Sequence, residues 1–188
     1  ELPLSVKIRL GNRLAGDELR SFCLFLEAEG VDMITIHARL NGEKFCRKPR
    51  WAAIGEIKDA VSVPILANGG IFSPADARRC LELSGADGLM IGRGAVERPW
   101  LCGEIAREVY GIGEGRKQGE SSEIYSHFIT LLEQRFAPER RLGRLKQFTR
   151  YFAASFPFGH HLAASIQNSD CIEQARRRAA TFFARSVC

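Results

Sequence analysis

Short apolar runs alternate with amphipathic stretches along the first 110 residues of the chain. The apolar runs have the composition of strands, and the stretches between them repeat apolar residues at helical spacing. The predicted strands span residues 5–10, 33–37, 64–68 and 88–91. The predicted helices span residues 17–29, 51–61, 74–83 and 99–110, the third with Ser73 as its N-cap. This alternation predicts four consecutive βα units.

The predicted strands are short and mostly apolar, and two of them are apolar on both faces. Such strands are typical of a parallel sheet that helices cover. Their starts recur at intervals of roughly 25 to 30 residues, which is the spacing of βα units. Four units make half of a (β/α)8 TIM barrel, so the predicted fold class is α/β. An open four-stranded doubly wound sheet is the alternative architecture.

The pattern changes at residues 111–119, which are rich in glycine and predict a linker. A helix capped by Ser121 or Ser122 is predicted up to residue 136, and Pro138 begins another that runs to about residue 155. Residues 157–159 break the pattern, and two shorter helices follow, the last near residues 171–187. We therefore predict a barrel-type domain over residues 1–115 and a small all-α domain over residues 116–188.

Composition narrows the class of protein. Of the 188 residues, 45% are hydrophobic and 26% are charged, which is ordinary for a soluble protein. No apolar stretch has membrane-spanning length and no signal peptide begins the chain, so no membrane role is expected. The six cysteines form no C-x-x-C pair, which favours reduced thiols in a cytoplasmic protein over a zinc site or a disulfide framework. The pattern leaves the oligomeric state open.

The net charge of +5 is unevenly distributed. Residues 1–115 carry 15 Lys and Arg against 16 Asp and Glu, whereas residues 116–188 carry 12 against 6. The basic excess of +6 therefore belongs to the helical part, and it indicates a polyanionic partner there.

Candidate chemistry lies late in the predicted strands and just after them, because ligands of parallel α/β folds bind at the carboxyl ends of strands. These positions hold Lys7 and Arg9, His37 and Arg39, Asn68-Gly69-Gly70, and Gly92-Arg93-Gly94. Glycines let a backbone approach a phosphate closely, and an arginine can add a charge-assisted contact. The alternatives are a strand-end lysine that reaches water, a satisfied core histidine, and glycines that only shape turns.

A second candidate lies on the helix after Pro138. Its apolar residues share one arc, and its basic residues, Arg140, Arg144, Lys146 and Arg150, fall on the other side. That face suits RNA phosphates, and the alternative is a solvated helix face. The run Arg176-Arg177-Arg178 is a weaker signal of the same kind. No metal site is expected, since His160-His161 has no third ligand at suitable spacing.

Several of these stretches resemble the tRNA-dihydrouridine synthases, most nearly their bacterial C-type branch. They are residues 5–11 (SVKIRLG), 34–39 (ITIHAR), 67–71 (ANGGI), 85–95 (GADGLMIGRGA), 144–147 (RLKQ) and 167–169 (QNS). The resemblance implies an FMN-binding TIM barrel followed by a helical tRNA-binding domain. It implies an oxidoreductase that reduces a uridine of tRNA to 5,6-dihydrouridine, with NADPH as the reductant. The C-type branch suggests tRNA position 16.

The resemblance also implies roles for individual residues. The FMN-binding residues would be Lys7, His37, Asn68, Gly69, Gly70, Gly92 and Arg93. Arg39 would lie on the substrate side of the pocket, and the basic residues of the helix after Pro138 would contact tRNA.

One family motif is missing. The catalytic acid of the family is a cysteine in an N-x-G-C-P loop, and no such loop occurs in these 188 residues. We therefore expect the chain to be the C-terminal portion of a synthase, with the acid upstream, and to be inactive alone. Two alternatives stay open: a non-catalytic RNA-binding module on a half-barrel scaffold, and a phosphate-binding barrel enzyme acting on a small sugar phosphate.

Overall fold

A computed structural model describes residues 2–44, 46–113 and 120–185. The chain forms two compact units. The first comprises Glu1–Gly94 and Ile105–Ile112, and the second comprises Ala95–Glu104 and Gly113–Cys188. The predicted boundary between residues 115 and 116 falls in a segment outside the described residues, as does much of the predicted linker.

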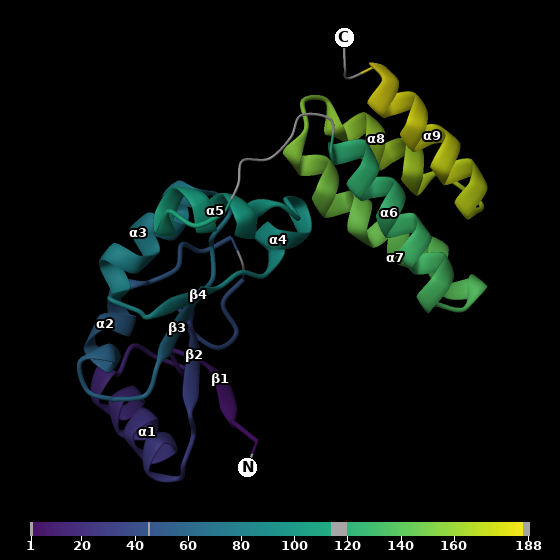
Figure 1. The fold of residues 1–188 in the computed structure, drawn as a ribbon. Helices are drawn as coiled ribbons and strands as arrows, with labels where there is room; N and C mark the ends of the chain where they lie inside the picture. Colours follow the sequence, from purple (N-terminus) through teal and green to yellow (C-terminus); the bar gives the residue numbers. More distant parts are fainter. Residues whose placement is uncertain (1, 45, 114–119, 186–188) are drawn as a thin grey trace. The chain divides into compact units, whose positions relative to one another are not determined.

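The first unit contains a four-stranded sheet (Figure 1). All strand pairs are parallel and the order is β1-β2-β3-β4. The strands are β1 (Ser5–Arg9), β2 (Met33–His37), β3 (Ile65–Asn68) and β4 (Gly88–Met90). The intervening helices are α1 (Gly16–Ala28), α2 (Ala52–Lys58) and α3 (Pro74–Ser84), and α4 (Arg93–Glu97) and α5 (Leu101–Tyr110) follow β4. The predicted α/β class with a parallel sheet is confirmed.

Strand order separates the two predicted architectures. A doubly wound sheet reverses direction at a switch point and places helices on both faces. Here consecutive strands are neighbours, and α1, α2 and α3 lie along one face of the sheet (Figure 1). The centre of that face is apolar and closed to solvent, since Ile34, Ile36 and Ile65 have no exposed area. The sheet is therefore not doubly wound, and the sequential order is the one that βα barrels use.

Helix α3 shows how local sequence sets an element. Ser73 accepts a hydrogen bond from the Asp76 backbone N–H (3.1 Å), and Asp76 in turn accepts one from the Phe72 N–H (3.0 Å). Pro74 occupies the first turn and Gly85 ends the helix in the left-handed conformation. Ser73 is therefore the N-cap, as predicted, and the cap fixes where the chain leaves the loop after β3.

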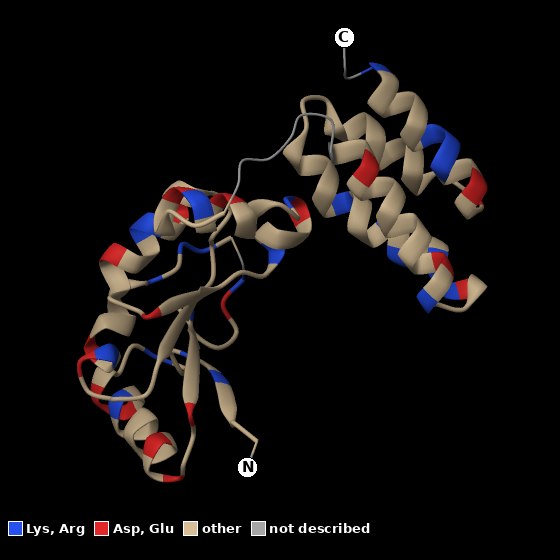
Figure 2. Cartoon of the chain, viewed as in Figure 1, with Lys and Arg blue, Asp and Glu red and all other residues tan. Residues whose placement is uncertain are grey.

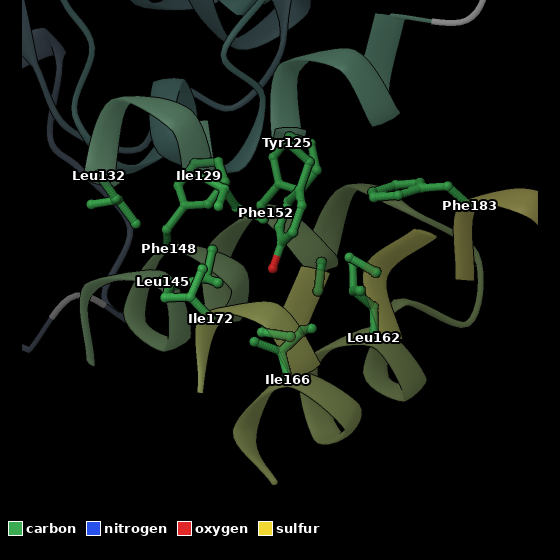
Figure 3. Close-up of a cluster of buried hydrophobic side chains, with 13 residues drawn as sticks. Tyr125, Ile129, Leu132, Leu145, Phe148, Phe152, Leu162, Ile166, Ile172 and Phe183 are labelled. Carbon is green, nitrogen blue, oxygen red and sulfur yellow. The ribbon is translucent and has the colours of Figure 1, made fainter. Parts of the chain in front are cut away.

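Outside the turns, the described residues of the second unit are helical. Its helices include α6 (Glu120–Arg135), α7 (Pro138–Phe152), α8 (Gly159–Gln167) and α9 (Ile172–Arg185), with a 3-10 turn, η1, at Ala153–Ser155. Tyr125, Phe152 and Leu162 lie at the centre of their shared core (Figure 3). The rings of Trp100 and Phe152 pack edge to face, with centroids 6.0 Å apart.

The structure corrects a few predicted boundaries. Helix α6 begins at Glu120, so Ser121 and Ser122 lie inside the helix and neither is its N-cap. The short helix α4 was not predicted, because its five residues are too few to show a periodic pattern. The end of the last predicted helix, at residue 187, lies outside the described residues.

Candidate anion-binding site at the carboxyl end of the sheet

Register places one residue from each strand in a row near the carboxyl edge of the sheet. Arg9 pairs with His37, His37 with Asn68, and Asn68 with Met90. Residues in register on neighbouring strands project to the same face, so this row lies on the face opposite the helices. Lys7 and its partner Thr35 lie two residues earlier and project to the same face. The sheet thus brings together candidates that are far apart in the sequence.

His37 is the buried centre of this row, with 6% of its surface exposed. Its Nε2 lies 3.1 Å from Nη1 of Arg39. The pKa of His37 is lowered to about 4, first because burial disfavours the charged ring and then because four cations act on it: Lys7, Arg9, Arg39 and Arg93. At neutral pH the imidazole is therefore uncharged, and it lies among groups that are positively charged.

The cations also act on one another. The pKa of Lys7 is lowered by burial and then by Arg9, and that of Arg39 by burial and then by Arg93. Glu43 has the opposite effect on Arg39, but Arg50 binds both Glu43 carboxylate oxygens at 2.7 Å. Because like charges raise one another's energy, an anion placed among them would be stabilised. The electrostatics of this edge favour binding of phosphate or another anion.

The loop after β3 passes close to the His37 ring. A Cβ atom at Gly69 would lie 2.6 Å from Cδ2 of His37, and one at Gly70 would lie 2.8 Å from Cγ of Pro49. Both glycines have positive φ, at 108° and 73°. The indole N–H of Trp51 donates to the Gly69 carbonyl at 2.9 Å. Only glycine fits this path, so the loop backbone is fixed against the histidine.

Two neighbouring residues have structural contacts that the sequence did not indicate. The Asn68 amide donates to the Met90 carbonyl at 2.6 Å and so ties β3 to β4. Arg39, predicted on the substrate side, donates through Nε and Nη2 to the Arg47 carbonyl at 2.9 and 2.7 Å. Arg39 is 3% exposed and therefore anchors the loop after β2 as well as contacting His37. Trp51 is a site residue that sequence reasoning missed, because its partner is 18 positions away.

The loop at Gly92 and Arg93 is less closely packed than the Gly69–Gly70 loop. The Arg93 guanidinium lies over the Phe72 ring, 5.6 Å from its centroid. A Cβ atom at Gly92 would have no neighbour within 4 Å, and Gly92 is exposed. The predicted companion loop thus presents an arginine beside open space, whereas the Gly69 loop is tightly enclosed.

The second candidate site, the basic face of α7, belongs to the other unit. Leu145, Phe148 and Phe152 of α7 are buried, as the predicted apolar arc requires. Three of the predicted basic residues are exposed: Arg140, Arg144 and Arg150. The fourth, Lys146, is partly buried. Lysine and arginine recur along α7 and α9 in Figure 2. The Arg144 guanidinium lies 4.2 Å from the Phe136 ring centroid, so this residue also covers apolar surface.

Two classes of site are not found in the described part of the chain. No group of three or more His, Cys, Asp or Glu side chains there is arranged to hold a metal ion. None of the helices over the same residues has both the length and the apolar composition to cross a bilayer.

Comparison with known proteins links the chain to one family. The dihydrouridine synthase family matches residues 1–182. The chain is 33% identical over 174 residues to the tRNA-dihydrouridine(16) synthase of Aquipseudomonas alcaligenes, covering 91% of this chain and 55% of that protein. It is 30% identical over 180 residues to probable tRNA-dihydrouridine synthase 1 of Synechocystis, covering 94% and 50%. A probable tRNA-dihydrouridine synthase of Rhodobacter capsulatus is 38% identical over 133 residues, covering 69% and 40%. The chain spans about half the length of the first two relatives.

Proposed function

Because this chain belongs to the dihydrouridine synthase family, we propose that it forms the C-terminal half of an FMN-binding TIM barrel and a helical tRNA-binding domain. The whole enzyme would reduce a uridine of tRNA to 5,6-dihydrouridine, with NADPH as the reductant. The observation that carries the proposal is the group of four cations around an uncharged His37 at the carboxyl edge of the sheet.

The sheet supports the half-barrel part of the proposal. Strands β1 and β4 are its two edges, and each has one neighbour within the sheet. Sequential order with helices on one face is what a barrel requires, and closing such a barrel needs further strands beside both edges. Residues 1–115 would then be the barrel part, and residues 116–188 the helical part.

The residues at this edge fit an FMN phosphate and its ring. The backbone at residues 69 and 70 carries no side chain of its own and lies against His37, where its groups can reach a phosphate. Arg93 beside the open space at Gly92 can bind a phosphate oxygen through a charge-assisted hydrogen bond. Lys7 projects to the same face of the sheet, and its charge would stabilise negative charge on a reduced flavin. When bound, FMN would supply the hydride that saturates the uracil 5,6 double bond.

The chain's own residues would bind and orient the ligand rather than donate a proton to the uracil. His37 is uncharged at neutral pH, and it lies against Arg39 and the Gly69 backbone. Asn68 is held by the Met90 carbonyl, and Trp51 holds the Gly69 carbonyl, so the loop backbone is preorganised for a ligand. The sequence contains no N-x-G-C-P loop. We place the acid for uracil C5 outside these 188 residues and expect the chain alone to be inactive.

A non-catalytic RNA-binding module is the second candidate, and the missing cysteine loop favours it. Both candidates use the basic face of α7, where exposed arginines would contact tRNA phosphates. They differ in the first unit, because the module would have no use for flavin.

Titration of the 188-residue chain with FMN, followed by quenching of flavin fluorescence, tests the proposal. We expect saturable binding that Lys7→Ala and Arg93→Ala each weaken by roughly 10-fold or more, since each removes an interaction with a charged group. Arg20→Ala, an exposed cation on α1, is the matched control and should bind like the parent chain. A folded chain that binds tRNA but no FMN would favour the RNA-binding module and overturn the flavin assignment.

A further inference from the structure

The turn between η1 and α8 holds an aromatic side chain out in solvent. Phe158 has φ of 56°, and it is the one non-glycine residue with positive φ among those the structure describes. Its side chain is 72% exposed. The ring lies beside the exposed His160 and His161 rings, with its centroid 6.5 Å from each. An apolar ring held at the surface in a disfavoured backbone conformation suggests a binding role.

The backbone after Phe158 fixes this turn. Gly159 is buried, and a Cβ atom there would stand 1.7 Å from the Ala153 carbonyl oxygen, so residue 159 must be glycine. The Gly159 N–H donates to the Phe156 carbonyl at 3.1 Å, and the His161 N–H donates to the Phe158 carbonyl at 2.9 Å. The turn is thus held on both sides of Phe158, and the direction of its side chain is set by the fold.

The exposed ring lines a groove of about 720 Å³ in the second unit. Phe156 and Phe182 also line the groove, and their ring centroids lie 6.3 Å apart. The His161 ring stacks on Phe158, with centroids 6.5 Å apart and ring planes 29° apart. The volume is within the range of small-ligand sites and is large enough for a nucleotide.

The charge of the groove selects the class of occupant. Its described lining residues include Arg178 and Arg185, and they include no Asp or Glu. Arg178 is held in place, because its Nη1 donates to the Ser165 carbonyl at 2.8 Å and to the Ser169 hydroxyl at 3.1 Å. Aromatic faces next to arginines are the features with which proteins bind single-stranded nucleic acid: bases stack on rings and phosphates contact cations.

We propose that Phe158 and this groove bind an unpaired nucleotide of RNA, with the base stacked on Phe158 and its phosphate toward Arg185. The inference rests on the proposed function only in taking tRNA as the RNA partner. It adds a stacking site that the sequence does not predict, separate from the basic residues of α7, and the site includes Arg178 of the Arg176-Arg177-Arg178 run. It also gives the exposed phenylalanine and the left-handed turn one common purpose.

The test measures binding of an unmodified tRNA transcript to the 188-residue chain by fluorescence anisotropy. We expect Phe158→Ala to weaken binding about 5- to 50-fold, the usual effect of losing one base-stacking side chain. Phe158→Trp should bind like the parent chain, and the RNA should quench its tryptophan fluorescence beyond the change that Trp51 and Trp100 give in the parent chain. Phe25→Ala, which removes a ring that is 55% exposed on α1, is the matched control and should leave affinity unchanged.

The salt dependence of the affinity distinguishes the contribution of base stacking from that of charge. Phe158→Ala should leave the slope of log affinity against log salt unchanged, whereas Arg185→Gln should reduce its magnitude by about 1. The inference is overturned if Phe158→Ala binds like the parent chain and Phe158→Trp fluorescence does not respond. It is also overturned if a Glu-rich peptide, rather than RNA, quenches that tryptophan. Failure of the parent chain to bind tRNA would instead overturn the RNA part of the proposed function, and the inference with it.

Discussion

The backbone of Gly69 lies against the ring of His37 so closely that a Cβ atom at residue 69 would stand 2.6 Å from Cδ2 of the imidazole. A side chain at residue 69 would displace the buried imidazole, and the φ of 108° at Gly69 itself favours glycine. The contact joins the ends of β2 and β3 into one rigid edge. The proposed FMN site uses that edge.

Gly69→Ala is therefore expected to destabilise the chain by about 1–3 kcal/mol, the cost of backbone strain at one residue, and to weaken FMN binding. Urea unfolding and the FMN titration measure the two effects. Gly103→Ala is the control, since this glycine lies in α5 and its Cβ position has no neighbour within 4 Å. It should leave stability unchanged or raise it by up to about 1 kcal/mol. Equal stability of both variants would argue against a close contact between Gly69 and His37.

Acid should destabilise the first unit through His37. The unfolded ring titrates near its ordinary pKa of 6.5 and the folded ring near 4, so the unfolded state binds more protons between these values. The contribution of the neutral ring to stability is complete above pH 6.5 and is lost as the pH falls toward 4. His37→Gln should reduce the slope of unfolding free energy against pH in this window. A slope identical to that of the parent chain would show that another group causes it.

The basic face of α7 predicts a salt-dependent affinity for tRNA. Each phosphate contact adds about 1 to the slope of log affinity against log salt, so Arg140→Gln and Arg150→Gln should each reduce its magnitude by about that amount. Both side chains are exposed, and their loss should leave the unfolding temperature unchanged. Arg20→Gln on α1 provides the comparison. If all three variants show one common slope, the α7 face does not contact RNA.

Tyr125 should matter for stability alone. Its hydroxyl lies 2.5 Å from the Thr149 hydroxyl in the core of the second unit, and burial raises the pKa of Tyr125 to about 12. Tyr125→Phe is expected to cost about 1 kcal/mol, the net value of one buried hydrogen bond. Because the unfolded phenol ionises near pH 10, the parent chain should lose stability from pH 10 to 12 more steeply than the variant. Thermal unfolding at pH 8 and pH 11 compares the two, and tRNA binding at pH 7 should not change.

The sequence predicted the sheet well because each strand carries a strong local signal. The apolar run of β2 was placed at residues 33–37 and lies there, and Ser73 begins α3 as its side-chain chemistry requires. The row of Arg9, His37 and Asn68 was also foreseeable, since parallel strands end at one edge. The contacts of Arg39 with Arg47 and of Trp51 with Gly69 were not, because loop conformation decides them and no periodicity encodes it.

Helix α6 and the turn at Phe158 also show that local sequence does not determine every feature. Ser121 and Ser122 are good cap residues by type, yet α6 begins before both, at Glu120. The sequence predicts only a break in the helical pattern at Phe158, and nothing in the residue type predicts a positive φ. That conformation follows from the packing of Gly159 on Ala153, a tertiary contact that residue preferences do not contain.

The row of residues that are in register at the carboxyl edge, Arg9, His37, Asn68 and Met90, makes the site sensitive to some changes in chain length and tolerant of others. Each βα unit contributes one residue to the row, so residues inserted into the loop after Leu40 would leave Arg9, His37 and Asn68 side by side. Deleting a single residue inside β2 would instead turn the imidazole to the face covered by helices. The length of the loop after β2 can therefore change without disturbing the row, whereas the number of residues within the strand cannot.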